Sequence, residues 1–301
     1  MKDIRYESRR IGVGMIVVTG ATGTVGRPLV ALLKDQGVAV RAVARFADAG
    51  TVPVGVEVHK ADLARPEEVA PALEGARALF VHPRAVGESA AKLVALAAEK
   101  GVRRIVVLSA INVDDDPSYQ PSRLNGDRNK EVEDAVAGGG LPWVAVRASS
   151  FATNAIGMFG AQVRAGDVIR APYGDFAEAP IHEADLAAVI ARALVDNNLD
   201  GRRISVTGPG SVTHEEMVAV IGEVIGRPLS FQEVPAELAV RGMVANGLPE
   251  AFVNALMARY ERGAGNPAPV TDEVERILGR PARNFGQWVA DHADAFGAVA
   301  S

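Results

Sequence analysis

The first two thirds of the chain alternate between short apolar runs and longer amphipathic stretches. Most of the runs are β-branched, do not alternate with polar residues and end at glycine, proline or a charged residue, which is typical of buried parallel strands. Most of the intervals between them are long enough for one crossover helix. The pattern predicts strands at Ile16–Val18, Val38–Ala44, Val54–Val58, Ala78–Val81, Ile105–Leu108, Pro142–Val146 and Arg203–Thr207.

The intervals predict the helices of βαβ units. Their expected positions are Arg27–Leu33, Pro66–Leu73, Val86–Lys100, Asn129–Ala137 and Asp185–Val195. A polar stretch with two prolines, Asn112–Asn125, predicts a loop, and the chain from Thr213 to Phe296 is mostly helical in pattern. We therefore expect an N-terminal extension (1–14), an α/β domain (15–150 with about 181–207) and a second lobe (151–180 and 208–301).

Three glycines follow the first predicted strand at intervals of three residues: Gly20, Gly23 and Gly26. Glycine tolerates positive φ and has no side chain, so such a turn can bring backbone N–H groups against a pyrophosphate. The helix that follows directs its positive end at the same anion. The alternative is a plain turn between strand and helix, because tight turns also collect glycine. We interpret the motif as a dinucleotide-binding turn.

Arg45 ends the second predicted strand. Dinucleotide-binding folds contact the adenosine ribose at this strand end, roughly 20 residues beyond the glycines. An acidic residue there favours NAD, whereas a basic one accommodates the 2′-phosphate of NADP. Arg45 therefore favours NADP(H). The alternative is a solvated Arg45, with Asp48 capping the next turn or binding the ribose.

Polar or special residues stand at the ends of several predicted strands. In an open parallel sheet, ligands bind in the crevice beyond the carboxyl ends of the strands. Because these ends meet along one edge, the residues there are expected to converge on one site. They are Gly20, Arg45, Asp62, His82, Ser109 and Arg147.

Composition limits the other classes of function. A net charge of −5 gives no reason to expect a nucleic acid or an anionic membrane as partner. The chain of 301 residues has no cysteine, so redox chemistry must come from a cofactor, and its five histidines show no metal-ligand spacing. It has no stretch of transmembrane length and no secretory signal. We expect a cytoplasmic protein.

Four motifs together resemble the NmrA-like branch of the atypical short-chain dehydrogenases/reductases. They are TGATGTVG at Thr19–Gly26, Asp62-Leu63, the strand ending in Ser109-Ala110, and RASSFATN at Arg147–Asn154. The sequences PIHEADL (Pro180–Leu186) and VTGP (Val206–Pro209) also fit, so the resemblance extends from Met15 to about Phe296. It implies a Rossmann-type doubly wound parallel sheet, a smaller, mostly helical C-terminal substrate lobe, and NADP(H) as cofactor.

The resemblance also assigns cofactor contacts to particular residues. It implies that Arg45 binds the 2′-phosphate, and that Asp62 and Leu63 lie near the adenine. His82 and Pro83 would lie beside the nicotinamide ribose, and Phe151 and Asn154 at the nicotinamide pocket. The pyrophosphate would be held by the turn residues Gly20, Thr22, Gly23, Thr24, Val25 and Gly26.

The chain departs from the short-chain dehydrogenase pattern at the tyrosine and lysine that supply the proton. That pattern pairs a tyrosine with a lysine four residues later, but Tyr119 is followed at that spacing by Arg123. Ser109, Tyr119 and Lys130 are the catalytic candidates. Tyr119 can also be a solvated loop residue and Lys130 an ordinary exposed lysine.

Two other residues have a structural alternative to a role in the reaction. His82 can donate a proton or simply end its strand as a satisfied histidine. Asp185, at the start of a predicted helix, is expected to be a cap or a structural acceptor of hydrogen bonds rather than a catalyst.

Two kinds of function therefore stay open. One is an NADPH-dependent reductase that transfers hydride to a quinone-like or conjugated carbonyl compound, with natural-product biosynthesis as one setting. Such aromatic or quinone-like acceptors delocalise the incoming charge and need a weaker acid than an isolated ketone. The other is an NADP(H) sensor that regulates a partner without turnover. Sugar-nucleotide epimerase chemistry is a more distant third. The oligomeric state is left open, with a homodimer as one option.

Overall fold

A seven-stranded parallel sheet forms the centre of the protein, which we describe from a computed structural model covering residues 14–48 and 50–297. Its strand order is β3-β2-β1-β4-β5-β6-β9, and the order reverses between β1 and β4. In such sheets the ligand crevice lies beyond the carboxyl ends at the reversal. The strands are β1 (Met15–Thr19), β2 (Val40–Val43), β3 (Glu57–His59), β4 (Ala76–Val81), β5 (Arg104–Ala110), β6 (Trp143–Ala148) and β9 (Arg202–Val206).

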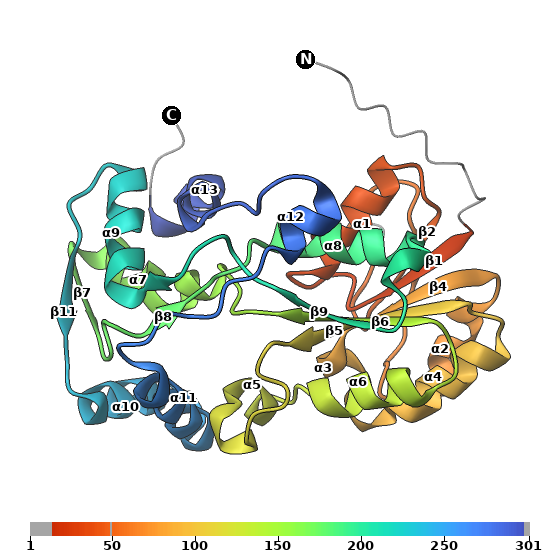
Figure 1. Ribbon diagram of the computed structural model, residues 1–301, viewed down its shortest axis with the longest axis horizontal. Helices are drawn as coiled ribbons and strands as arrows, with labels where there is room; N and C mark the ends of the chain where they lie inside the picture. Colours follow the sequence, from red (N-terminus) through yellow and green to blue (C-terminus); the bar gives the residue numbers. More distant parts are fainter. Residues whose placement is uncertain (1–13, 49, 298–301) are drawn as a thin grey trace, which may run out of the picture.

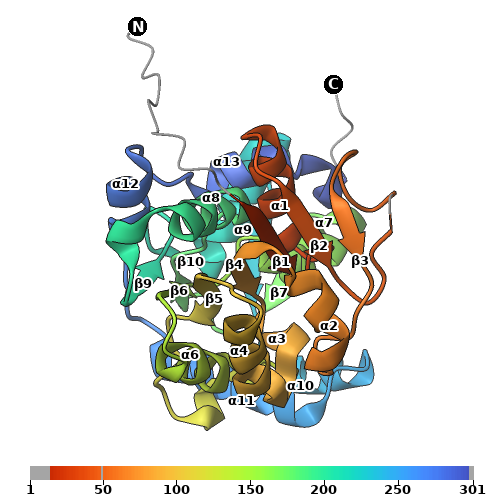
Figure 2. The same cartoon turned by 90° about the vertical axis from the view of Figure 1, so that its right-hand side faces the viewer.

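Helices cover both faces of this sheet, as Figures 1 and 2 show, which explains why its strands are apolar on both sides. One face packs on α1 (Gly26–Asp35), α8 (Glu183–Val195) and α12 (Glu273–Leu278). The other packs on α2 (Pro66–Leu73), α4 (Ala90–Glu99) and α6 (Asn129–Gly138). The short elements near this second face are α3 (Pro83–Val86), η1 (Gly87–Ser89), η2 (Pro117–Tyr119) and α5 (Pro121–Leu124); η4 (Asn197–Leu199) precedes β9.

A second group of elements stands beyond the carboxyl ends of the sheet, on the left of Figure 1. It has two small sheets, formed by β7 (Val168–Ala171) with β11 (Ser230–Glu233) and by β8 (Ala177–Glu178) with β10 (Val212–Thr213). Its largest buried side chain is Trp288. Its helical elements are η3 (the π-helix Ile156–Gly160), α7 (Ala161–Ala165), α9 (His214–Ile225), α10 (Ala236–Ala245), α11 (Glu250–Gly263), α13 (Phe285–Asp291) and η5 (Ala293–Phe296).

Most of the predicted elements are confirmed, with ends displaced by a few residues, but three predictions need correction. The expected helix Val86–Lys100 is broken, because Gly87 adopts φ +56° and ends α3, and α4 begins only at Ala90, after η1. The strand expected at Val54–Val58 begins only at Glu57, and Val54 is exposed. The expected loop Asn112–Asn125 contains η2 and α5.

The sequence pattern did not predict the four short strands of the second lobe, β7, β8, β10 and β11. The domain boundaries at 150, 181 and 207 stay predictions. The expected N-terminal extension lies outside the described residues except for Gly14. Within the described ranges, no helix combines the length and apolarity that crossing a bilayer would require.

Candidate cofactor and substrate site

The turn between β1 and α1 uses each of its three glycines differently. Gly20 has φ +63°, a conformation that L side chains rarely adopt. A Cβ at Gly26 would lie 2.2 Å from the backbone oxygen of Gly20, so helix and turn pack too closely for any side chain. A Cβ at Gly23 would meet only that same oxygen, at 3.3 Å. Gly23 is exposed, so the space beyond it is open to a ligand.

The amino end of α1 fits a pyrophosphate. Its N-cap residue, Val25, makes no side-chain hydrogen bond to the helix, and the first turn carries no acidic residue. The first N–H groups of a helix need acceptors, and their partial positive charge favours an anion. Gly23 and Thr24 are exposed beside them, while Thr22 is half-buried. The predicted pyrophosphate contacts are compatible with this cradle, which a branched side chain at Gly23 would fill.

Arg45 lies exposed immediately beyond β2. Its guanidinium carbon is 5.7 Å from the centre of the Phe46 ring, and it forms no ion pair with any residue of 14–48 or 50–297. The alternative ribose ligand, Asp48, accepts a hydrogen bond from the N–H of Gly50 at 2.9 Å and so belongs to the next turn. This arrangement leaves Arg45 available to a phosphate, while its role stays a prediction.

The predicted adenine contacts follow β3. Asp62 accepts a hydrogen bond from the N–H of Ala64 at 3.1 Å, and its own N–H donates to the Glu68 carboxylate at 3.0 Å. Leu63 is buried among the residues of the α2 face. Both side chains therefore shape the loop after β3, and contact of either with adenine stays a prediction.

His82 lies against the glycine turn. Its N–H donates to the Thr19 hydroxyl at 2.9 Å, and a Cβ at Gly20 would lie 3.1 Å from the His82 Cβ. Burial lowers the pKa of His82; the Asp127 carboxylate opposes this effect and Arg84 adds to it. The ring is therefore neutral at pH 7 and can donate one hydrogen bond. Pro83 opens α3 directly after it. Sequence reasoning missed Thr19, although a polar last residue in a buried strand is a signal.

Ser109, at the end of β5, donates its hydroxyl hydrogen bond to Glu133 at 2.7 Å. Glu133 is completely buried on α6 and also accepts from Arg147 and Arg203, each at 2.6 Å. Burial by itself would raise the pKa of Glu133, but hydrogen bonds from Arg147, Ser109 and Arg203 lower it below its usual range. The structure thus brings two strand-end residues, Ser109 and Arg147, to one carboxylate. Sequence reasoning missed this carboxylate, because a glutamate beside Val132 carries no sign of burial.

The other two catalytic candidates also have partners. The Lys130 ammonium lies 2.9 Å from Asp134 and 3.4 Å from Asp114, and the hydrogen bond that it donates to Asp134 is the main reason that its pKa is raised. The ring of Tyr119 lies under the guanidinium of Arg262, 4.7 Å from its carbon to the ring centre. The structure does not gather Ser109, Tyr119 and Lys130 into one hydrogen-bonded group, and their catalytic roles stay predictions.

The predicted nicotinamide contacts lie where β6 leads into the second lobe. Phe151 is half-buried and pairs with Ile181 through a parallel bridge, while Asn154 is exposed. The π-helix Ile156–Gly160 begins two residues later, and such π-turns occur frequently at functional sites. Their contact with nicotinamide stays a prediction.

Asp185 is confirmed as a structural acceptor. Its carboxylate is completely buried and accepts hydrogen bonds from Arg280 and from the backbone N–H and guanidinium of Arg283. His182 caps α8 by accepting from the N–H of Ala184 at 3.1 Å. These two residues of the PIHEADL motif therefore hold α8 and the C-terminal chain together.

Comparison with known proteins identifies the family. The NAD(P)H-binding protein family matches residues 20–197, from the glycine turn to the end of α8. The chain belongs to this family. This NAD(P)H-binding protein is 36% identical, over 94% of its length and 99% of the relative, to a (4-alkanoyl-5-oxo-2,5-dihydrofuran-3-yl)methyl phosphate reductase of Streptomyces griseus. It is 30% identical, over 95% of its length and 100% of the relative, to an NAD(P)H azoreductase of Xenophilus azovorans.

Solved structures share the whole fold. An NADPH-dependent quinone oxidoreductase of Escherichia coli matches this NAD(P)H-binding protein with a TM-score of 0.77 at 21% identity, covering 93% of its chain and 100% of that chain. A variant of NmrA matches with a TM-score of 0.71 at 18% identity, covering 92% and 94%. These likenesses confirm the predicted Rossmann-type fold, which NmrA shares, and the family match confirms the binding of a nicotinamide dinucleotide.

Proposed function

We propose that this protein is an NADPH-dependent reductase that transfers hydride to a quinone-like or conjugated carbonyl compound, with a role in natural-product metabolism. The observation that carries the proposal is the turn at Gly20, Gly23 and Gly26, which leaves the amino end of α1 open to a pyrophosphate. Two relatives of nearly the same length are named as reductases of a conjugated lactone and of azo compounds. A homodimer and a cytoplasmic location are further predictions of this proposal.

The choice of NADPH over NADH rests on Arg45. A guanidinium at the end of β2 can form charge-assisted hydrogen bonds with a 2′-phosphate. No carboxylate among the described residues competes for it, and Asp48 is engaged by Gly50. We therefore expect the extra phosphate of NADPH to increase its affinity over that of NADH.

When bound, the dihydronicotinamide supplies the hydride. With a conjugated carbonyl acceptor the hydride joins the β-carbon, and a proton joins the α-carbon of the enolate. No tyrosine of the sequence has a lysine four residues later, so the usual proton donor is absent. A delocalised enolate needs less stabilisation than an alkoxide. Water would then suffice as proton source, and the neutral ring of His82 would donate a hydrogen bond while keeping its proton.

The contacts of Ser109 and Lys130 favour such an acceptor. The Ser109 hydroxyl already donates to Glu133, and the Lys130 ammonium lies between two aspartates. Both groups are held by the ion network of α6 before any substrate arrives. We therefore assign Ser109 and Lys130 to the positioning of β5 and α6. For the third candidate, we expect Tyr119→Phe to leave kcat unchanged. A fall of about 10²–10⁴-fold in kcat would instead make Tyr119 the proton donor.

The experiment that tests the proposal follows NADPH absorbance with quinones, azo dyes and acyl butenolides as acceptors. We expect the purified protein to oxidise NADPH with at least one of these classes. Tight NADPH binding without consumption across the panel would overturn the reductase and support the sensor. The variant Gly23→Val is the control for each acceptor, because it should lose turnover together with cofactor binding.

A further inference from the structure

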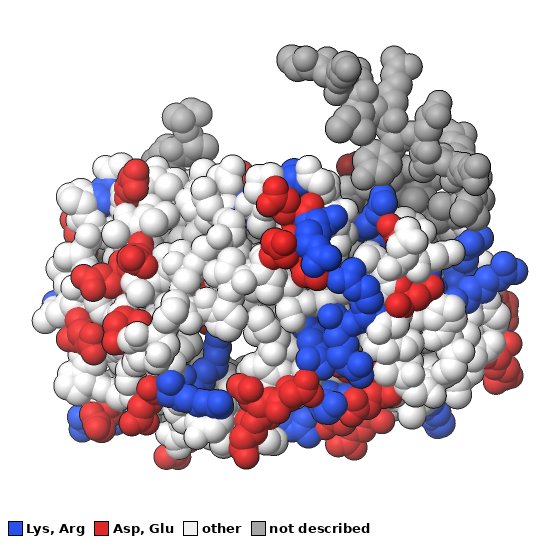
Figure 3. Space-filling view, viewed as in Figure 1, with Lys and Arg blue, Asp and Glu red and all other residues white. Residues whose placement is uncertain are grey.

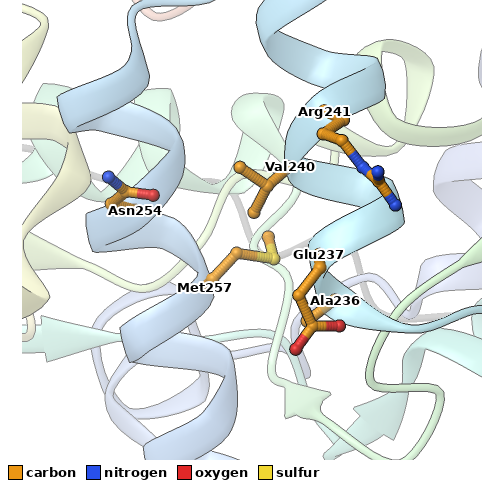
Figure 4. Close-up of a pocket in the computed structure, with 6 residues that line it drawn as sticks. All are labelled: Ala236, Glu237, Val240, Arg241, Asn254 and Met257. Carbon is orange, nitrogen blue, oxygen red and sulfur yellow. The ribbon is translucent and has the colours of Figure 1, made fainter.

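The inner face of α11 brings two arginines to the crevice beyond the sheet. Arg259 and Arg262 are three residues apart and so lie on one side of the helix. Asn254 and Met257 line a cavity of about 560 Å³ between α10 and α11, which Figure 4 shows from close up. At 3.6 residues per turn, the two arginines lie on the opposite side of α11 from Met257. They face the elements that follow β5 and β6 instead of α10.

The two arginines differ in how firmly they are held. Arg259 donates to Glu178 at 2.9 Å, its carbon lies 5.4 Å from the centre of the Phe176 ring, and Glu178 is almost completely buried. Arg262 is 56% exposed and forms no hydrogen bond with any described residue. Its nearest carboxylate oxygen, on the exposed Asp115, is 3.6 Å away. Arg259 is therefore a structural partner, whereas Arg262 keeps its donors for another acceptor.

Tyr119 gives Arg262 a fixed orientation. The ring lies 4.7 Å below the guanidinium carbon, a distance at which a cation over an aromatic face is attracted. Tyr119 ends η2, whose loop is tied by the buried Gln120, which donates to the backbone oxygen of Asp115 at 2.6 Å. A planar guanidinium oriented in this way presents its N–H edge to an anion, and two parallel bonds to phosphate oxygens are a geometry that arginine favours.

The position of Arg262 is on the substrate side of the molecule. Its contacts Tyr119 and Asp115 belong to the segment that leaves the carboxyl end of β5, where open sheets bind their ligands. Figure 1 shows α11 beside α5, and Figure 3 shows a hollow in this face of the molecule with charged side chains at its rim. Arg262 is therefore at the end of the sheet where a substrate is expected.

We propose that the substrate of this reductase carries a phosphate monoester and that Arg262, oriented by Tyr119, binds this group. The inference rests on the proposed function and adds the anionic arm of the substrate to it. The name of the Streptomyces relative pairs a conjugated lactone with a phosphate ester, which makes that compound the first to test. Asp115 is the nearest competing anion in the free protein, and Asp116 is also close enough to interact with the charge of Arg262. The substrate phosphate displaces Asp115.

The test is calorimetric titration of the NADP⁺ complex with (4-alkanoyl-5-oxo-2,5-dihydrofuran-3-yl)methyl phosphate and with the corresponding alcohol. The unmodified protein should bind the ester about 10- to 100-fold more tightly than the alcohol, since charge-assisted pairs are worth that much. Arg262→Ala should abolish this preference, and Arg262→Lys should keep only part of it. Arg241→Ala removes the same charge from the exposed α10 and should keep the preference in full.

Asp115→Asn separates binding from a merely structural role. If Arg262 acts only through its ion pair with Asp115, this variant should lose affinity for the ester as Arg262→Ala does, and that result would overturn the proposal. If Arg262 binds the phosphate, removal of the competing carboxylate should keep or increase the affinity. Equal binding of ester and alcohol by the unmodified protein would also overturn it. NADPH oxidation by unphosphorylated quinones tests the reductase separately, so the two proposals can fail independently.

Discussion

Two helices of this molecule begin in opposite ways, although each follows a strand. At α9, Thr213 accepts from the N–H of Glu216, and the Glu216 side chain accepts in return from the N–H of Thr213. At α1 the N-cap residue Val25 offers no side-chain acceptor and the first turn has no acid. The first N–H groups of any helix need acceptors, and the capping box of α9 supplies them. At α1 the N–H of Arg27 donates to the backbone oxygen of Gly23 and Pro28 has no N–H, so the N–H of Gly26 is the one that we expect a ligand to accept from. The difference is compatible with a cofactor site at α1, which stays a prediction.

The largest effect is expected from a side chain that fills the space at the amino end of α1. Gly23→Val should abolish dinucleotide binding, because a branched side chain would occupy the space in which the pyrophosphate lies. The fold should survive, since the only close neighbour of the new Cβ is the Gly20 oxygen at 3.3 Å. Fluorescence titration with NADPH measures the loss, and circular dichroism checks the fold. Gly242→Ala, which meets nothing within 4 Å, is the matched control. A folded Gly23→Val that binds NADPH normally would contradict the motif.

Charge reversal at Arg45 tests the predicted contact with the 2′-phosphate, at the other end of the cofactor. Arg45→Asp should weaken NADPH binding by about 10- to 100-fold while NADH changes little, because a contact worth roughly 1.5–3 kcal/mol becomes a repulsion. Arg103→Asp, at the amino edge of the sheet, makes the same change of charge away from the site. Equal losses of affinity for NADPH and NADH would show that another residue binds the 2′-phosphate.

Removing the side-chain cap at the amino end of α9 tests the helix that satisfies its own N–H groups. Thr213→Ala should lower the free energy of unfolding by about 1 kcal/mol and leave the NADPH dissociation constant unchanged. Thermal unfolding with and without NADPH measures both quantities. A change in cofactor affinity would show that the second lobe takes part in binding the dinucleotide, contrary to the comparison.

The smallest expected effect is a dependence of stability on pH. Burial lowers the pKa of His214, which is enclosed by Phe159, Phe176 and Tyr260; the Glu178 carboxylate opposes this effect. The unfolded chain takes up a proton around pH 6.5 and the folded chain only at a lower pH, so this stability is fully present well above pH 6.5 and is lost as the pH falls through 6.5 toward the lower pKa of the folded state. The loss between pH 6.5 and 6.0 is at most about 0.4 kcal/mol. In urea unfolding at several pH values, His214→Phe should remove this dependence of stability on pH. If the variant keeps the same dependence, another group causes it.

The sequence was sufficient for the features that are local. The glycine turn, the predicted strand at Ile16–Val18 and the helix after it depend on neighbouring residues, so their pattern predicts them. The break at Gly87 was missed because a single glycine within an apolar helical pattern does not reveal its φ. The proposed substrate side was not predictable, because Arg262 meets Tyr119 across more than a hundred residues and nothing local marks that pair. The same holds for the burial of Glu133, which depends on arginines from β6 and β9.

The central claim is that hydride passes from a cofactor bound at the glycine turn to a conjugated carbonyl compound. It is tested most directly with NADPH that carries deuterium at C4 of the nicotinamide, prepared separately for each face, and an acyl butenolide as acceptor. Mass spectrometry and NMR of the product should show one deuterium at the β-carbon, from one of the two labelled cofactors only. A product without deuterium from either cofactor, or no product while NADPH stays bound, would contradict the account.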